Sequence, residues 1–366
     1  MALLLSKRPP WFVFLTHPRS VSDLLAHGAG SFIRHFSDDE ADFVAKVSSM
    51  PPIVIGEVTF GFSPIRGEVI CIMRMPNDLM SPSGKEQIGE GIRLAGQRGA
   101  RVVSLGALTA PATGGGQRLL RALPTGMTLT NGNAYTAVVV LRNVEEASVA
   151  VGLGSRARVA VIGCTGSVGV AASNLISQAG FDLILVGRSA DRVHHQFKNL
   201  AGRAIMTGDL GSVREADIIV LLTNDPSAEL KPDLVKGGTV VIDCAQPSNI
   251  PKSARPSFLL RDIVVTQGAL VRIPEYSCSY DLDLPAHTDT FACLAEAYLF
   301  ARSGIRENSV GKPAADQALS LERLASTLGV SPRPLTPDVD ALRKTNIYQH
   351  SESSKDQIFA DGCSPQ

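Results

Sequence analysis

From residue 158 onward, short apolar runs of strand length alternate with segments of helical length, and this alternation constrains the fold more than any other feature. The runs are continuous and rich in β-branched residues, which is typical of strands buried on both faces of a parallel sheet. One helix is expected over 168–179. The central third of the chain is therefore predicted to be a Rossmann-type, doubly wound α/β domain with strands at 159–162, 183–186, 218–222, 239–242 and 263–266.

A glycine loop joins the first of these strands to the helix that follows it. Its three glycines have a GxxGxxG spacing instead of the GxGxxG form. The first permits a tight turn, the second lets the backbone approach a pyrophosphate, and the third lets helix and strand pack closely. Free N–H groups at the helix start attract phosphate. The alternative is a tight turn without a ligand. We predict a dinucleotide site made by Gly163, Thr165, Gly166, Ser167, Val168 and Gly169.

The end of the next strand indicates which dinucleotide is preferred. A site selective for NAD usually places Asp or Glu there to bind the ribose 2′-hydroxyl. This chain has Gly187, Arg188 and Ser189 instead. Arg188 can pair with a 2′-phosphate, and Ser189 can assist it. We therefore expect NADPH as the cofactor; the alternative for Arg188 is a solvated surface arginine.

Composition excludes several classes of protein. The 35 basic residues balance the 35 acidic residues, so the net charge of the chain does not favour binding to nucleic acid. No apolar run reaches the roughly 18 to 20 residues of a membrane helix, although peripheral membrane contact stays open. The six cysteines form no CxxC pair, and we expect reduced thiols, no metal site and a cytoplasmic location.

Cys293 is the cysteine best placed for chemistry. A helix is predicted over 289–302, with Thr288 or Asp289 as its cap. About one turn in, free N–H groups and the helix dipole can lower the pKa of a thiol. From spacing alone, a small core residue is the more frequent role for such a cysteine. Cys244, at the end of a strand of the predicted sheet, is a rival.

Five short segments share a pattern with one enzyme family. They are Val-Phe-Leu-Thr-His at 13–17, which is similar to the family's Gly-His-Leu-Thr-Ser opening only at Leu15 and Thr16, Leu-Gly-Ala-Leu-Thr at 105–109, Thr-Asn-Gly-Asn-Ala-Tyr-Thr-Ala at 130–137, the glycine loop, and Phe-Ala-Cys-Leu-Ala-Glu at 291–296. In order and spacing the chain resembles the cyanobacterial-type long-chain acyl-[acyl-carrier-protein] reductases over about residues 13 to 335. The resemblance implies that Cys293 accepts the acyl group and that the product is an aldehyde.

Two departures from the family pattern concern histidines. The family's opening histidine falls on Phe14, so His17 inherits no role, and the histidine of its Gly-Asn segment is replaced by Tyr135. The resemblance does not extend to long-chain specificity. An oxyanion in the reaction needs a hydrogen-bond donor. The candidates are Asn133, Tyr135 and Thr136, with His17 as a candidate acid; the alternatives are a structural turn and a structural histidine.

The resemblance also suggests a division of the chain. We expect a second α/β domain for the acyl substrate over 1–150 and the NADP-binding domain over 151–270. The segment 271–345 would carry the cysteine helix, complete the substrate domain and contribute C-terminal helices. The polar segment 346–366 is predicted to be a disordered tail.

The expected function is NADPH-dependent reduction of an acyl thioester to an aldehyde through a covalent acyl-cysteine. The acyl donor would be an acyl carrier protein or a coenzyme A thioester. One alternative is an NADP-dependent ketone or alcohol dehydrogenase that forms no covalent adduct. Another is an NADP-sensing Rossmann protein without turnover.

Overall fold

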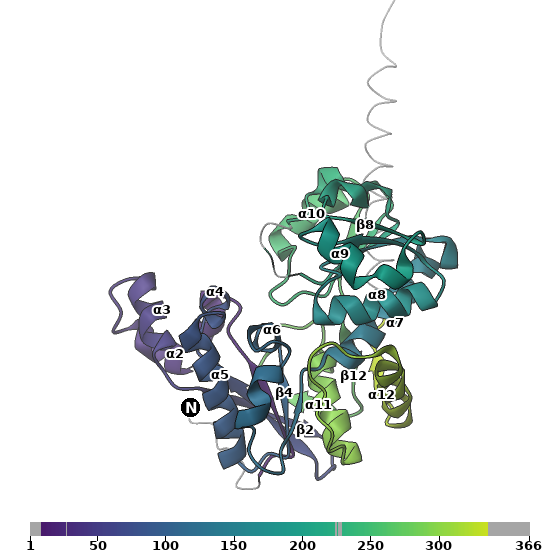
Figure 1. The fold of residues 1–366 in the computed structure, drawn as a ribbon. Helices are drawn as coiled ribbons and strands as arrows, with labels where there is room; N and C mark the ends of the chain where they lie inside the picture. Colours follow the sequence, from purple (N-terminus) through teal and green to yellow (C-terminus); the bar gives the residue numbers. More distant parts are fainter. Residues whose placement is uncertain (1–8, 27, 224, 226–228, 336–366) are drawn as a thin grey trace, which may run out of the picture. The chain divides into compact units, whose positions relative to one another are not determined.

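The computed structural model describes residues 9–26, 28–223, 225 and 229–335. The chain divides into two compact units (Figure 1). The first consists of Met1–Val139 and Ala269–Arg333, and the second of Val140–Gly268 and Pro334–Gln366. Domain boundaries were predicted between residues 150 and 151 and between residues 270 and 271. The two units divide between residues 139 and 140 and between residues 268 and 269. The predicted tail, 346–366, lies outside the described residues.

The second unit contains a fully parallel sheet of strand order β11-β10-β9-β6-β7-β8. This is the doubly wound order 3-2-1-4-5-6 when β6 is counted first, so the predicted Rossmann-type α/β class is confirmed. β8 was not predicted. The strands are β6 (Arg158–Ile162), β7 (Asp182–Val186), β8 (Ala204–Thr207), β9 (Ile218–Leu221), β10 (Val240–Asp243) and β11 (Val264–Gln267).

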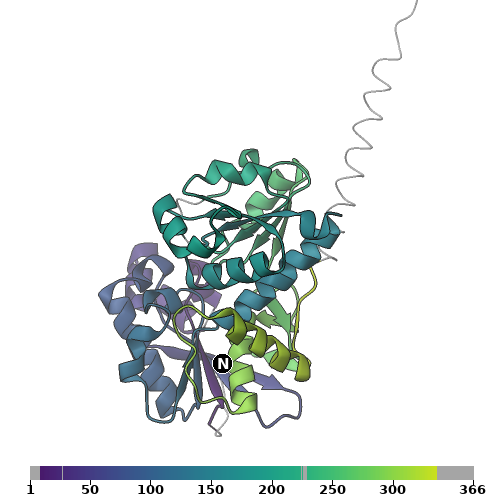
Figure 2. The ribbon, with the colours of Figure 1, turned by 45° about the vertical axis from the view of Figure 1, so that its right-hand side comes forward.

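Helices of the second unit pack on this sheet (Figure 2). They are α8 (Ser167–Gln178) against β6 and β7, α9 (Ala190–Gln196) against β7 and β8, and α10 (Arg255–Leu259) against β11. The sheet residues Ile184, Ile219 and Val241 are fully buried. Burial on both faces explains why these strands read as unbroken apolar runs.

The first unit contains a mixed sheet of order β13-β2-β3-β1-β4-β5. β1, β3, β4 and β5 run parallel, whereas β2 is antiparallel to β3, and β13 to β2. The strands are β1 (Phe12–Thr16), β2 (Ile53–Phe60), β3 (Arg66–Cys71), β4 (Val102–Leu105), β5 (Thr128–Thr130) and β13 (Tyr276–Cys278). A small antiparallel sheet joins β14 (Asp289–Phe291), β12 (Leu270–Arg272) and β15 (Ser331–Pro332).

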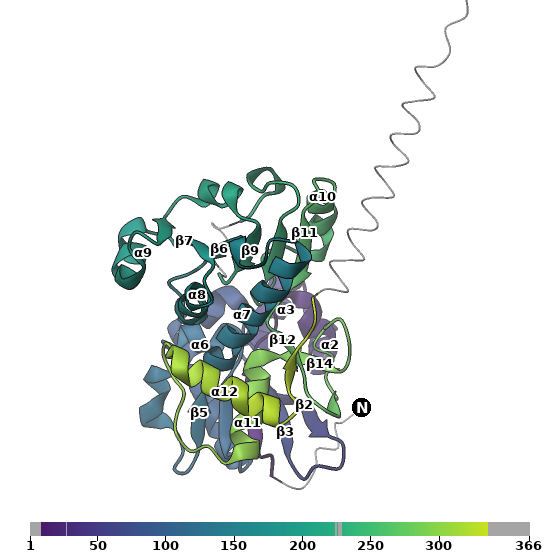
Figure 3. The same cartoon turned by 90° about the vertical axis from the view of Figure 1, so that its right-hand side faces the viewer.

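Helices of the first unit supply the rest of its core. α5 packs on β1 and β3, and its buried residues include Ile88, Ile92 and Ala95. α11 packs on β1 and β4, and also on α12, beside which it lies in Figure 3. α7 begins in the first unit and ends in the second. The helices are α1 (Val21–Ala26), α2 (Gly28–Arg34), α3 (Glu40–Ser48), α4 (Pro76–Leu79), α5 (Pro82–Gln97), α6 (Thr109–Ala112), α7 (Asn133–Ala150), α11 (Ala292–Ser303) and α12 (Ala315–Thr327).

The predicted start of the cysteine helix was wrong. α11 begins at Ala292 because the preceding residues pair with β12 as β14. Phe291 occupies the cap position and makes no side-chain cap hydrogen bond. The Asp289 carboxylate instead forms ion pairs with Arg272 at 3.1 Å and Arg333 at 2.9 Å. Within the described residues, no helix combines the length and apolar character needed to cross a bilayer.

Candidate functional site

Cys293 is the second residue of α11, and it is partly exposed between the buried neighbours Ala292 and Leu294. The hydroxyl of Ser104, on β4, donates to the Cys293 carbonyl oxygen at 3.0 Å. Gly132 follows the end of β5, and a Cβ added there would overlap Cα and Cβ of Cys293. The cysteine therefore lies against the carboxyl ends of β4 and β5, which is where parallel sheets commonly bind ligands.

The electrostatic environment of the thiol differs from the prediction. Burial raises the pKa of Cys293 to about 12, and the nearby Glu296 carboxyl acts in the same direction. Hydrogen bonds from the backbone N–H groups of Leu294, Ala107 and Cys293 itself act in the opposite direction. The predicted lowering by the helix start is present but is outweighed, because the thiol leaves water when α11 packs on the sheet.

The turn after β4 contains Ala107, whose backbone N–H acts to lower the pKa of this thiol. Ala107 has a φ of 47°, a left-handed conformation that is uncommon for a residue with a side chain. Thr109 closes the turn, because its N–H and its hydroxyl both donate to the Gly106 carbonyl, at 3.1 and 2.7 Å. The N–H of Gly106 donates to the Leu15 carbonyl at 2.8 Å. The sequence predicted no function for this turn.

Glu296 is a second residue that the sequence reasoning missed. It lies one helical turn after Cys293 and is fully buried. Its carboxylate accepts hydrogen bonds from the Thr130 hydroxyl and, at 2.8 Å, from the Tyr135 N–H. Burial raises the pKa of the Glu296 carboxyl, and these hydrogen bonds oppose that rise. The available signal was an acidic residue in the middle of the mainly apolar stretch 292–301.

The three predicted oxyanion donors lie on the first turn of α7. The Tyr135 side chain is 1% exposed within the apolar core, and its pKa is raised by burial and by Glu322. The Thr136 hydroxyl donates to the Gly132 carbonyl at 2.6 Å. The backbone N–H of Asn133 donates to the Asn131 side chain at 3.1 Å. The burial of Tyr135 argues against its predicted role as a donor to substrate.

His17 directly follows β1 and is buried. Its Nδ1 lies 2.8 Å from the Pro18 carbonyl oxygen, and the Leu108 N–H donates to its Nε2 at 3.2 Å. These partners require the tautomer that carries its proton on Nδ1. Burial lowers the pKa of His17, which keeps the ring neutral. Both ring nitrogens are occupied, and this geometry argues against the predicted role of His17 as an acid.

The glycine loop of the second unit has the predicted form. Gly163 has a φ of 88°, and a Cβ there would lie 2.8 Å from the Leu222 carbonyl. A Cβ at Gly169 would overlap the Gly163 carbonyl oxygen, so α8 can approach the loop only at a glycine. Gly166 is exposed, and Thr165, Ser167 and Val168 are partly exposed. With no acidic residue in its first turn, the start of α8 is open to an anion.

β7 is followed by Gly187, Arg188 and Ser189, with no acidic residue among them. Arg188 is 78% exposed and lies 3.7 Å from the Asp225 carboxylate. The Ser189 hydroxyl caps α9 by accepting from the Arg192 N–H at 3.4 Å. Arg188 would therefore exchange its Asp225 partner for a phosphate, whereas Ser189 already has a structural role.

Two cysteines of the second unit, Cys164 and Cys244, are poor nucleophile candidates. Cys164 is fully buried within the glycine loop, and burial raises its pKa to about 12. Cys244 is partly exposed at the end of β10, and burial together with Asp243 raises the pKa of its thiol. All cysteines in the described ranges are free thiols. In the same ranges, no group of three or more His, Cys, Asp or Glu side chains could hold a metal ion.

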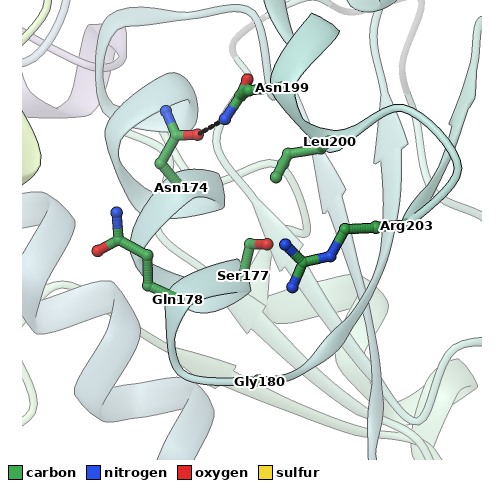
Figure 4. Close-up of a pocket in the computed structure, with 7 residues that line it drawn as sticks. All are labelled: Asn174, Ser177, Gln178, Gly180, Asn199, Leu200 and Arg203. Carbon is green, nitrogen blue, oxygen red and sulfur yellow. Dashed lines mark hydrogen bonds between the residues drawn. The ribbon is translucent and has the colours of Figure 1, made fainter.

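A shallow hollow of about 270 Å³ lies elsewhere on the second unit (Figure 4). Its lining includes Asn174 and Ser177 of α8, together with Asn199 and Arg203. Asn199 donates to Asn174 at 3.5 Å. These residues lie toward the carboxyl end of α8, whereas the glycine loop adjoins its amino end. The hollow is therefore separate from the predicted nucleotide site.

Comparison with known proteins gives partial likenesses. No family model matches the sequence. The chain is similar to the long-chain acyl-[acyl-carrier-protein] reductase of Synechococcus elongatus, with 30% identity over 190 residues, 49% of this chain and 53% of the relative. It is also similar to the aminotransferase PigE of a Serratia species, with 23% identity over 372 residues, 94% of this chain and 43% of the relative. The chain spans about half the length of the curated relatives it matches.

Solved structures give weaker likenesses. The L-tryptophan dehydrogenase of Nostoc punctiforme aligns over 94% of this chain and 90% of its own, with 11% identity and a TM-score of 0.43. The YhdH oxidoreductase of Salmonella enterica in complex with NADP aligns over 37% of this chain and 43% of its own, with 18% identity and a TM-score of 0.30. These TM-scores are too low to carry an argument about this chain.

Proposed function

We propose that the protein is an NADPH-dependent reductase that converts an acyl thioester to an aldehyde through an acyl-cysteine at Cys293. One observation carries the proposal. Cys293, a partly exposed residue, lies at the start of a helix and against the carboxyl ends of β4 and β5, where parallel sheets commonly bind ligands. The similarity to an acyl-[acyl-carrier-protein] reductase over half the chain supports the same chemistry.

The chain's residues account for the acyl-transfer step. The Cys293 thiolate attacks the thioester carbonyl carbon, a new C–S bond forms, and the carrier leaves as its own thiolate. Because the pKa of Cys293 is raised to about 12, loss of its proton is a separate requirement of the step. The carrier thiolate that leaves can take up that proton, so the charges balance.

The glycine loop fits a dinucleotide. A residue larger than glycine at position 163 or 169 would displace neighbouring backbone atoms. Gly166 has no side chain to cover the start of α8. Arg188 offers a guanidinium for the 2′-phosphate. When bound, NADPH supplies the hydride that reduces the acyl-cysteine carbonyl. The C–S bond of the resulting thiohemiacetal alkoxide then breaks, which releases the aldehyde and restores the Cys293 thiolate.

Intact-mass spectrometry tests the proposal. The protein is incubated without NADPH with acyl-coenzyme A and, separately, with an acyl carrier protein thioester. We expect a mass increase of one acyl group, lost in Cys293→Ala and retained in Cys278→Ala, a matched control because Cys278 is also partly exposed in the first unit with a raised pKa. Adding NADPH should discharge the adduct and give an aldehyde that a hydrazine traps.

The rival functions give different outcomes in the same experiment. A dehydrogenase without a covalent intermediate would oxidise NADPH with a ketone and would show no acyl adduct. A sensing protein would bind NADPH and oxidise none with any of these substrates. An adduct that survives Cys293→Ala would contradict the assignment of the nucleophile.

A further inference from the structure

Asp243, the last residue of β10, places a buried carboxylate at the carboxyl end of the parallel sheet. Its Oδ1 accepts from the Ala245 N–H at 3.1 Å. Its Oδ2 accepts from the Ser248 hydroxyl at 2.6 Å and from the Ile250 N–H at 2.9 Å. All three donors belong to residues 244–250, which we call the β10 loop. One side chain therefore fixes the conformation of this loop through both of its oxygens.

The β10 loop is joined to the glycine loop through the residues that follow β9. The Asn249 side-chain amide donates to the Thr223 carbonyl oxygen. The Cys244 N–H donates to the Leu221 carbonyl oxygen at 3.0 Å. A Cβ added at Gly163 would lie 3.0 Å from the Thr223 Cβ. The glycine loop, the end of β9 and the β10 loop therefore form one continuous stretch of the sheet edge.

The strand order places the β10 loop and Arg188 on opposite sides of the glycine loop. β6, which leads into the glycine loop, lies between β7 and β9, and β10 lies beyond β9. Arg188 follows β7. The order of winding reverses at β6, and doubly wound sheets bind ligands at such switch points. With the pyrophosphate at the glycine loop and the 2′-phosphate at Arg188, the nicotinamide half of NADPH would extend over the ends of β9 and β10.

The residues of the β10 loop and its anchor differ in exposure. Cys244 and Gln246 are partly exposed at the sheet edge, whereas Asp243 and Ala245 are buried. A buried carboxylate is costly unless it is hydrogen-bonded. The presence of Asp243 at this position, where the rest of β10 is apolar, is explained by the loop that it holds.

On the basis of the proposed function, we infer that Asp243 is a positioning residue for NADPH, because it holds the β10 loop against which the nicotinamide half of the cofactor binds. Asp243 does not touch the cofactor. It acts through the loop, whose partly exposed residues Cys244 and Gln246 offer the contact surface. The adenosine half, bound near Arg188 on the other side of the glycine loop, does not depend on Asp243.

The test compares two ligands that share the adenosine half of the cofactor. NADPH carries the nicotinamide riboside, whereas adenosine 2′,5′-bisphosphate ends at its 5′-phosphate. Asp243→Asn keeps the size of the side chain, but an amide accepts on one side only and turns its NH₂ group toward a backbone N–H of the loop. Asp217→Asn is the matched control, because Asp217 accepts from the Arg158 N–H at 2.8 Å at the amino end of the same sheet. Dissociation constants are measured by titration calorimetry on the whole chain.

We expect Asp243→Asn to raise the dissociation constant of NADPH by about tenfold or more. The dissociation constant of adenosine 2′,5′-bisphosphate should change by less than about twofold. Asp217→Asn should leave both constants within about twofold of those of the unaltered protein. A purely structural role for Asp243 would weaken the binding of both ligands together. An equal loss for the two ligands, or no loss for NADPH, would overturn the inference.

A second variant applies if Asp243→Asn fails to fold. Asn249→Ala removes the hydrogen bond to Thr223 that joins the β10 loop to the end of β9, and Asn249 is only partly buried. NADPH binding should weaken by at least about threefold, with adenosine 2′,5′-bisphosphate unaffected. The absence of this difference would overturn the inference.

The outcomes also separate the two proposals. Acylation of Cys293 without NADPH should be the same in the unaltered protein and in both variants, since they alter only the cofactor site. If the unaltered protein binds NADPH but forms no acyl adduct, the proposed reaction fails and the titrations still decide the role of Asp243. If the adduct forms and the titrations show no selective loss, only the role of Asp243 fails. An unaltered protein that binds no NADPH would contradict both proposals.

Discussion

Alkylation of Cys293 by iodoacetamide should be slow near neutral pH and should accelerate as the pH rises. Burial raises the pKa of this thiol to about 12, whereas a free cysteine has a pKa of about 8.5. Only the thiolate reacts, so its population at pH 7.5 should be lower than that of a free thiol by roughly three orders of magnitude. Below the pKa, the rate should increase about tenfold with each pH unit.

The assay follows the Cys293 peptide by mass spectrometry between pH 7 and pH 10. The same peptide in the urea-unfolded chain gives the reference rate for an unburied thiol. A native rate at pH 7.5 equal to the unfolded rate would refute the reasoning, because burial would then not control the thiol. A lower rate without any rise toward pH 10 would refute it as well, since that behaviour indicates blocked access and not suppressed ionisation.

Glu296 supplies an internal check on the same prediction. Its carboxyl raises the Cys293 pKa, so Glu296→Gln should make alkylation faster at pH 8. The amide preserves the packing: its oxygen can accept from the Tyr135 N–H, and its NH₂ can donate to the Thr130 hydroxyl, which can rotate to accept. A slower reaction in this variant would contradict the electrostatic part of the argument.

Three further substitutions test the packing and the nucleotide site. Gly132→Ala should lower the free energy of unfolding by about 1–3 kcal/mol more than Gly126→Ala, because both have positive φ but only Gly132 is packed against the cysteine helix; equal losses in urea titrations would contradict this. Gly169→Ala should weaken NADPH binding by at least about tenfold, since the added Cβ displaces the glycine loop. The control Gly89→Ala places its Cβ in open space within α5 and should leave NADPH binding unchanged. This control should also stabilise the protein by up to about 1 kcal/mol. Arg188→Ala should weaken NADPH binding by about tenfold without affecting NADH; titrations in which both cofactors change equally would remove the 2′-phosphate role.

The nucleotide-binding fold could be predicted because its signals are local. Strands such as 159–162 are buried on both faces, so the run itself carries the information. The glycine spacing likewise encodes close approaches within one short loop, as the overlap between a Cβ at Gly169 and the Gly163 carbonyl shows. β8 escaped prediction because its apolar run, Ala-Ile-Met, is only three residues long and only one of the three is buried.

The surroundings of the cysteine could not be predicted in the same way, because they depend on long-range pairing. Residues 289–291 read as the start of a helix, and only their partner β12 makes them a strand. Asp289 has the character of a cap, yet its true partners are two arginines. A left-handed conformation is normally expected at a glycine. Because position 107 is an alanine, the sequence gives no signal for the left-handed conformation found there. His17 became interpretable only when Leu108 was located beside it.

The first unit is interrupted in the sequence, and this has a consequence for biosynthesis. Ser104 and Cys293 are 189 residues apart in the chain, yet they are hydrogen-bonded. The whole segment Val140–Gly268 is translated between them. During synthesis on the ribosome, the strands on which α11 packs are made long before α11 itself. The intervening unit can fold before that packing is possible. A newly made chain thus acquires Cys293 only after the whole of Val140–Gly268 has been translated, so the parallel sheet of the second unit is complete before the candidate nucleophile is present.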